Sequence, residues 1–156
     1  MKHRMSAVAV AVAVSAGLFL AVAPAASAAN PAEQVKARQQ HMKKFGGGMQ
    51  AIGKFLKGEG SVSDAQAGAA AIDEAAKADY AALFPQGTAA PVADSAARPE
   101  LWRDWAKTEK LWADMRPATA KLVEAAATGD KAQIAQAQQA TGKTCGGCHE
   151  DYRIKK

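Results

Sequence analysis

The sequence predicts an all-α protein, an antiparallel up-down-up-down bundle of four helices. Three observations lead to this fold class. Alanine, glutamine, lysine and glutamate, all strong helix formers, dominate the chain beyond its apolar start. No stretch alternates apolar and polar residues in the way that a half-buried strand does. Four segments instead repeat apolar residues at three- and four-residue spacing, which places those residues on one face of a helix.

The start of the chain has the form of a secretory signal peptide, residues 1–28. A basic segment at 2–4 precedes an apolar run at 6–23, Pro24 breaks that run, and residues 26–28 have the small–x–small form of a cleavage site. An uncleaved membrane anchor is the alternative, because the apolar run is nearly long enough to cross a bilayer. Pro24 and the small residues after it favour cleavage. We therefore expect an exported protein whose mature chain, residues 29–156, forms a single domain.

Composition limits what this mature chain can bind. Cleavage lowers the net charge from +5 to about +3, because the removed segment carries two basic side chains and no acidic ones. So small a charge does not indicate a nucleic acid or a membrane surface as a partner. The chain has two cysteines, only three residues apart, so it has no disulfide framework. Its length is sufficient for one hydrophobic core.

The first helix is expected over residues 31–57, with Asn30 as its N-cap and Gly58 at its end. Three consecutive glycines at 46–48 lie in its middle, where each costs roughly 1 kcal/mol relative to alanine. Close approach of a neighbouring helix or of a partner subunit would offset that cost. A local break in the helix is the alternative.

The second helix is expected over residues 64–83, where Ser63 and Gln66 form a capping-box pattern. The third is expected over residues 99–127, and Pro117 inside it predicts a kink.

The fourth helix is expected over residues 131–154, with Asp130 as its N-cap. Few residues separate the first helix from the second, or the third from the fourth, so each of these pairs should be antiparallel neighbours. A longer connection, residues 84–98, joins the two pairs and is rich in proline, glycine, alanine and serine.

The predicted fourth helix carries the motif Cys145-Gly146-Gly147-Cys148-His149. This pattern is typical of covalent haem attachment, in which two thiols bond to the two vinyl groups of one haem and the histidine binds the iron. On a helix, the three side chains lie on one face. One covalently attached haem, enclosed by the bundle, fits the rule that helix bundles hold their cofactors in the core.

Other uses of the two cysteines are a thiol–disulfide redox site, a zinc site and a structural disulfide. A redox Cys-x-x-Cys site normally lies where a strand leads into a helix, and no strand-like run precedes Cys145. Zinc requires about four ligands, and the mature chain offers two cysteines, His149 and the distant His41. None of the three requires a histidine directly after Cys148, so that residue favours haem.

The first helix supplies residues that suit the opposite side of a haem. Arg38 lies on its apolar face, where an arginine is rarely buried without a partner, and a haem propionate would provide one. Met42 lies one turn further on. A methionine there is usually core, but it could also bind the iron as a sixth ligand or block that side. His41 lies about 100° further round the helix, and we expect it in solvent.

Three stretches together resemble the cytochrome c prime family of bacterial periplasmic four-helix bundles. They are the C-terminal motif with Asp151-Tyr152-Arg153, the run Arg38-Gln39-Gln40-His41-Met42, and Ala97-Arg98-Pro99-Glu100-Leu101-Trp102. The resemblance covers the whole mature chain. It implies a periplasmic haem protein that forms homodimers through its first two helices. No set of residues in the sequence resembles a catalytic acid, base or nucleophile acting on an organic substrate, so we do not expect an enzyme.

The resemblance also implies a role for each matching residue. Cys145 and Cys148 would hold the haem, His149 would be the axial ligand of the iron, and Arg153 would lie on the same, proximal side. Further residues would border the haem elsewhere: Arg38 and Gln39 at the propionates, Met42 on the distal face and Tyr80 as a neighbouring aromatic residue.

Two functions follow from the resemblance. In the first, the iron is five-coordinate and high-spin, binds nitric oxide or carbon monoxide, and also transfers electrons. An apolar distal side without a hydrogen-bond donor would disfavour stable oxygen binding. In the second, Met42 is the sixth ligand and the protein is a low-spin electron carrier, as in relatives built on the same bundle.

Overall fold

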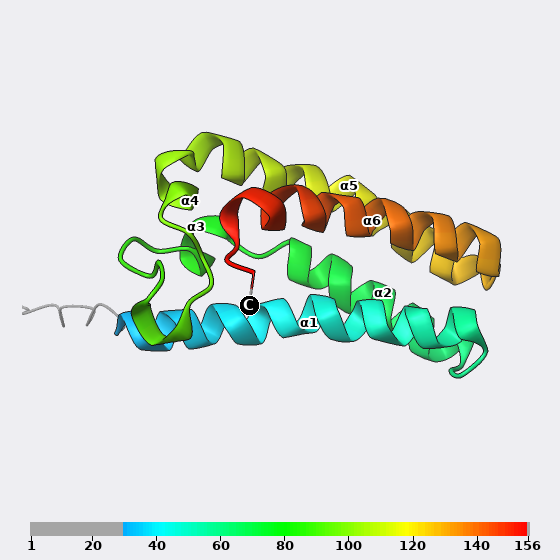
Figure 1. Cartoon of the computed structure of the whole chain (residues 1–156). Coiled ribbons are helices and arrows are strands. Elements are labelled where there is room, and N and C mark those ends of the chain that lie inside the picture. The colour runs from blue at the N-terminus through cyan, green and yellow to red at the C-terminus, as the bar shows by residue number, and fades with distance from the viewer. Residues whose placement is uncertain (1–29, 156) are drawn as a thin grey trace, which may run out of the picture.

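The computed structural model describes residues 30–155, so the predicted signal peptide lies outside the described residues. Four long helices lie side by side: α1 (Pro31–Lys57), α2 (Val62–Ala76), α5 (Trp105–Thr128) and α6 (Lys131–Tyr152) (Figure 1). Helix α1 packs against α2, α2 against α5, and α5 against α6. Consecutive helices run in opposite directions. The predicted all-α, up-down-up-down bundle is therefore confirmed.

The core lies between these four helices. Its fully buried aliphatic side chains come from every long helix, among them Ile52, Ile72, Leu122 and Ile134. None of the helices within residues 30–155 is both long enough and apolar enough to span a membrane.

Helix α1 has the predicted bounds and continues through its three glycines, so the alternative of a local break is wrong. Gly48 lies against α2, where a Cβ atom would come within 2.5 Å of the carbonyl oxygen of Gly68. Gly46 and Gly47 have open space at the same position. Close packing of a neighbouring helix therefore accounts for Gly48, but not for the other two glycines.

The second predicted helix, residues 64–83, is wrong in its extent. It divides into α2 and a single turn, α3 (Tyr80–Leu83). Helix α3 has its own N-cap, because the Asp79 carboxylate accepts a hydrogen bond from the Ala81 amide at 2.9 Å. The apolar pattern of α2 continues into these residues, but the Asp79 cap begins a separate helix.

The capping box of α2 consists of Ser61 and Asp64, not of Ser63 and Gln66 as predicted. The Ser61 hydroxyl accepts from the Asp64 amide, and the Asp64 carboxylate accepts from the Ser61 amide, both at 3.1 Å. Aspartate here replaces the glutamate or glutamine of the usual pattern. Gln66 instead donates to the carbonyl oxygen of Ala126 on α5, at 3.2 Å.

The third predicted helix, residues 99–127, is also divided, into α4 (Glu100–Arg103) and α5. The break falls at Asp104, and α5 continues across Pro117. The amide of Asp104 closes the short turn by donating to Glu100, at 2.9 Å. Its carboxylate accepts a hydrogen bond from the Tyr152 hydroxyl at the end of α6, also at 2.9 Å.

Helix α6 ends at Tyr152, two residues before the predicted end, because Arg153 is extended and forms a β-bridge with Ala97. The amide of Ile154 also donates to the carbonyl of Ala96, at 2.8 Å. The connection 84–98, with the short 3₁₀ helix η1 (Val92–Asp94), is thereby tied to the C-terminus. Both lie at one end of the bundle, together with α3 and α4 (Figure 1).

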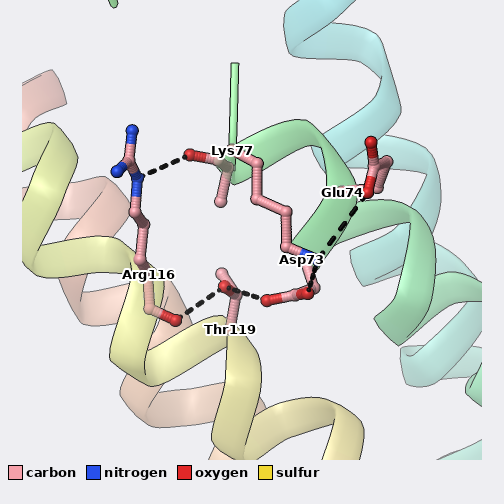
Figure 2. Close-up of polar contacts among 6 residues, drawn as sticks. Asp73, Glu74, Lys77, Arg116 and Thr119 are labelled. Carbon is pink, nitrogen blue, oxygen red and sulfur yellow. Dashed lines mark hydrogen bonds and ion pairs between the residues drawn. The ribbon is translucent and has the colours of Figure 1, made fainter. Parts of the chain in front are cut away.

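A partly buried polar contact joins α2 to α5 (Figure 2). The fully buried Thr119 hydroxyl donates to the Asp73 carboxylate at 2.8 Å, and the ammonium of Lys77 lies 2.8 Å from the other oxygen of that carboxylate. Nearby, the Nε of Arg116 donates to the carbonyl of Ala76, at 3.2 Å. These contacts hold the end of α2 against the middle of α5.

Candidate functional site

A largely apolar cavity of about 690 Å³ lies between the helices, at the end that holds the connection 84–98. Every site residue predicted from the sequence lines it: Arg38, Gln39, Met42, Cys145, Cys148, His149 and Arg153. Tyr80 lines it as well. The fold therefore brings together residues that are more than 100 positions apart in the sequence.

Helix α6 presents the cysteine–histidine motif to this cavity. Its N-terminus is fixed by Asp130, whose carboxylate accepts from two amides of the first turn. The helix then runs unbroken through Gly146 and Gly147 to Tyr152. Because the motif residues are three and four positions apart on a regular helix, they share one face. Cys145 and Cys148 are half-buried there, and His149 is exposed.

The two thiols are not in an environment that favours thiol redox chemistry. Burial raises the pKa of both Cys145 and Cys148, whereas reactive cysteines have a lowered pKa. The two side chains are unpaired thiols in the structure. Within residues 30–155, no group of three or more His, Cys, Asp or Glu side chains is placed to hold a metal ion. A zinc site thus has no ligand set in that part of the chain.

The imidazole of His149 is suited to binding a metal. Although the residue is exposed overall, partial removal of its ring from water lowers its pKa, and the positive charge of Arg153 lowers it further. A neutral imidazole keeps a lone pair that a metal ion can accept. Arg153 itself is exposed at the rim of the cavity and is held by its backbone bridge to Ala97.

Helix α1 forms another wall of the cavity, with the half-buried side chain of Met42. His41, which we expected in solvent, is half-buried, and that expectation is wrong. Its Nε2 lies 2.9 Å from the carbonyl oxygen of Ala75, and its ring centroid lies 5.7 Å from that of Phe45. The close packing of α2 on α1 covers this side chain, which does not line the cavity.

Arg38 is buried, and its guanidinium holds the connection 84–98 in place. Nη1 donates to Thr88 Oγ1 at 2.7 Å and to the Leu83 carbonyl at 3.3 Å. Nη2 donates to the Thr88 carbonyl at 2.8 Å and to Ser95 Oγ at 3.0 Å. Next to it, Gln39 donates to the carbonyl of Asp94 at 3.4 Å. Sequence reasoning missed Thr88 and Ser95, because nothing in their local pattern signals a partner 50 or more residues away.

Aromatic side chains form a further wall of the cavity around Tyr80. Its ring centroid lies 4.8 Å from those of Phe84 and Trp105 and 5.8 Å from that of Trp112. The side chain is 5% exposed, and its hydroxyl oxygen has no hydrogen-bond partner among the described residues. Burial raises the pKa of Tyr80 to about 12, so its hydroxyl is protonated at neutral pH.

These residues fit a covalently bound haem. Two thiols and a neutral imidazole share one face of α6, and that face opens on an apolar cavity. Cavities that hold cofactors have volumes of roughly 300–1,000 Å³, and this one lies in that range.

Comparison with known proteins gives the family. The family model described as cytochrome c' matches residues 33–153. The cytochrome c' of Rhodospirillum rubrum is 33% identical over 140 residues, which are 90% of this chain and 95% of that protein. A cytochrome c-556 of Agrobacterium tumefaciens is 36% identical over 131 residues, which are 80% of this chain and all of that protein.

Solved structures agree with the sequence relatives. A nitric oxide complex of a mutant cytochrome c prime from Alcaligenes xylosoxidans superimposes with a TM-score of 0.70 at 28% identity, covering 82% of this chain and 98% of that one. A second variant of the same protein, with bound carbon monoxide, gives a TM-score of 0.69 at 27% identity, covering 81% of this chain and 98% of that one. The chain therefore belongs to the cytochrome c' family, whose members are haem proteins and not enzymes.

Proposed function

We propose that this protein is an exported c-type cytochrome with one covalently bound haem, whose iron binds small gas molecules. Cys145 and Cys148 would form the thioether bonds, and His149 would be the axial ligand. The observation that carries the proposal is that these three side chains share one face of α6 and open on the same apolar cavity. Haem, when bound, supplies a one-electron couple and an iron that coordinates diatomic gases.

The wall formed by α1 supports gas binding. Met42 is an apolar side chain without a strong hydrogen-bonding atom, and it would leave the iron five-coordinate while restricting access to it. Nitric oxide and carbon monoxide are the ligands in the two related Alcaligenes structures. We extend both ligands to this chain as the proposed function, with electron transfer as an accompanying activity.

A second function rests on the same residue. The Met42 thioether lines the same cavity as His149, and a methionine paired with a histidine is an established axial ligand set in c-type cytochromes. With Met42 on the iron, the protein would be a low-spin electron carrier that does not bind gases readily.

The charged residues at the cavity would act on the propionates and on the proximal side. Both Nη atoms of Arg38 are already used by the connection 84–98, so Arg38 would act on a propionate through its buried charge and its Nε–H. Gln39 is exposed beside it, at the edge of the cavity. Arg153, one turn after His149, would lie on the proximal side.

The optical spectrum of the purified ferric and ferrous protein, with and without nitric oxide, tests these functions. A high-spin ferric spectrum that changes at once on addition of nitric oxide would support the gas-binding protein. A low-spin spectrum with a sulfur-to-iron charge-transfer band, unchanged by the gas, would establish Met42 as a ligand. Absence of a Soret band would refute both functions.

Two sets of variants separate the roles of the residues. Replacing Cys145 and Cys148 with alanine should abolish haem that survives denaturing electrophoresis, and its retention would refute the attachment site. Met42→Ala should raise the affinity for gas if the side chain only blocks the iron. If Met42 is a ligand, the same change should convert the iron from low to high spin and lower its reduction potential.

Export and dimerisation complete the proposal. The family supports a periplasmic location after cleavage near Ala28, which N-terminal sequencing of the secreted protein would check. A homodimer through α1 and α2 is supported by the open space at Gly47, which does not line the cavity and where another subunit could approach the helix backbone closely. Sedimentation equilibrium of the wild type and of Gly47→Glu tests this. A dimer that persists unchanged in the variant would exclude that surface.

A further inference from the structure

A second hollow, an open groove on the surface between α1 and α6, lies beside the cavity. These two helices pack far more loosely on each other than the other adjacent pairs of long helices do. Exposed polar side chains border the groove: Gln139, Lys143 and Glu150. Among residues 30–155, only Met49 of α1 and Gly142 of α6 line both the groove and the cavity. These two residues therefore form the partition between the solvent-facing groove and the apolar cavity.

The partition consists of one flexible side chain packed against bare backbone. Met49 is half-buried, and its Cε atom lies 3.7 Å from the position that a Cβ atom would take on Gly142. That distance is an ordinary van der Waals contact, so packing would also accept alanine at 142. Because glycine inside a helix costs roughly 1 kcal/mol relative to alanine, the fold alone does not account for Gly142. Its missing side chain leaves room in which the unbranched, adaptable Met49 side chain can change rotamer.

The backbone around this partition is held in place. The Nε2 atom of Gln138 donates to the carbonyl oxygen of Met49 at 3.0 Å, which ties α6 to α1 one turn before Gly142. Both helices are regular at these positions. A rotamer change of Met49 would therefore open the partition without separating the two helices.

We propose that small uncharged gases pass between the groove and the cavity through this partition, with Met49 as a gate and Gly142 as the space into which it moves. This inference rests on the proposed gas binding. The other border of the cavity, at Gln39 and Arg153, is the one that the proposed function assigns to the haem propionates and the proximal side. An apolar partition also selects among solutes, because an ion would lose its hydration there and a diatomic gas would not.

Flash photolysis of the carbon monoxide complex of the haem-loaded protein tests the gate. Light breaks the bond between iron and ligand, and the ligand then either rebinds from within the cavity or escapes. Met49→Ala should raise the rate constant of escape roughly fivefold, which corresponds to a barrier lower by about 1 kcal/mol. Gly142→Ala should lower it, because the added methyl group lies against the Met49 side chain. Met115→Ala is the matched control, because Met115 lines the cavity but not the groove.

Equilibrium affinity for carbon monoxide is the second readout. A gate changes entry and escape by the same factor, so the affinity of Met49→Ala should equal that of the wild type. Faster escape in Met49→Ala that Met115→Ala does not show would support the inference.

Three results would overturn the inference. A haem-loaded wild type that binds no carbon monoxide would refute the proposed gas binding and the gate together. With gas binding intact, unchanged escape in both Met49→Ala and Gly142→Ala would overturn the gate alone. Equally faster escape in Met49→Ala and Met115→Ala would also overturn it, because it would indicate a general loosening of the cavity.

Discussion

Replacing Arg38 with leucine should destabilise the protein far more than replacing an exposed arginine. Leucine keeps the apolar part of the side chain but removes all four hydrogen bonds to Leu83, Thr88 and Ser95. Thr88 is 0% exposed and Ser95 is 4% exposed, so water cannot readily replace the lost donors. A hydrogen bond to a charged group contributes about 1.5–3 kcal/mol, but removing the buried charge also removes its desolvation penalty. We expect a net loss of about 3 kcal/mol.

Urea unfolding of the haem-loaded protein measures this loss, and Arg103→Leu is the control. Arg103 is an exposed arginine whose pair with Glu100, at 3.0 Å, should contribute well under 1 kcal/mol. Amide exchange gives a local readout, because the amide of Ala97 donates to the Ser95 hydroxyl that Arg38 holds. The reasoning is refuted if both variants lose the same small free energy, or if exchange at Ala97 is unchanged in Arg38→Leu.

Further predictions concern the Asp73 carboxylate of α2 and the glycines of α1. Hydrogen bonding from Lys77 first, and also from Thr119, lowers the pKa of Asp73 in the folded protein, so the unfolded chain binds more protons as the pH falls through that carboxyl's range. The free energy of unfolding should therefore fall on acidification from about pH 5 to about pH 2, and it should fall by less in Asp73→Asn than in the wild type. Urea unfolding at several pH values measures this, and an equal pH dependence in the two proteins would contradict the prediction. In the monomer, Gly47→Ala should raise the free energy of unfolding by roughly 1 kcal/mol, because the helix gains a better helix former in open space. Gly48→Ala should lower it by about 1–3 kcal/mol, because the new methyl group would meet the backbone of Gly68; similar thermal unfolding of the two variants would contradict this.

Local signals determined much of the fold. The bounds of α1 follow from Asn30 and Gly58. The side-chain oxygen of Asn30 caps the start of the helix, and the positive φ of Gly58 ends it, so neither bound depends on distant parts of the chain. The apolar spacing within each helix and the short links between helices predict the bundle, because both act over a few residues. The cysteine–histidine motif is equally local, so its shared face on α6 was visible in the sequence.

The interruptions of the helices were decided by tertiary contacts. The apolar pattern runs through Asp104, yet the chain breaks there, where the Asp104 carboxylate binds the Tyr152 hydroxyl from 48 residues away. Likewise α6 stops at Tyr152 because Arg153 pairs with Ala97 in a distant segment. Neither partner can be identified from the local pattern.

Tertiary structure also decided the surroundings of the site residues. The sequence identified Arg38 as a buried cation that needs a partner, but Thr88 and Ser95 reach it only because the connection 84–98 folds over α1. The sequence also predicted Tyr80 beside the haem, but it did not indicate that the Tyr80 hydroxyl would be buried without a hydrogen-bond partner. Which side chains will share a helix face is set by the helical repeat and can be predicted from sequence. Which polar groups are satisfied once buried depends on distant segments, and only the folded chain determines it.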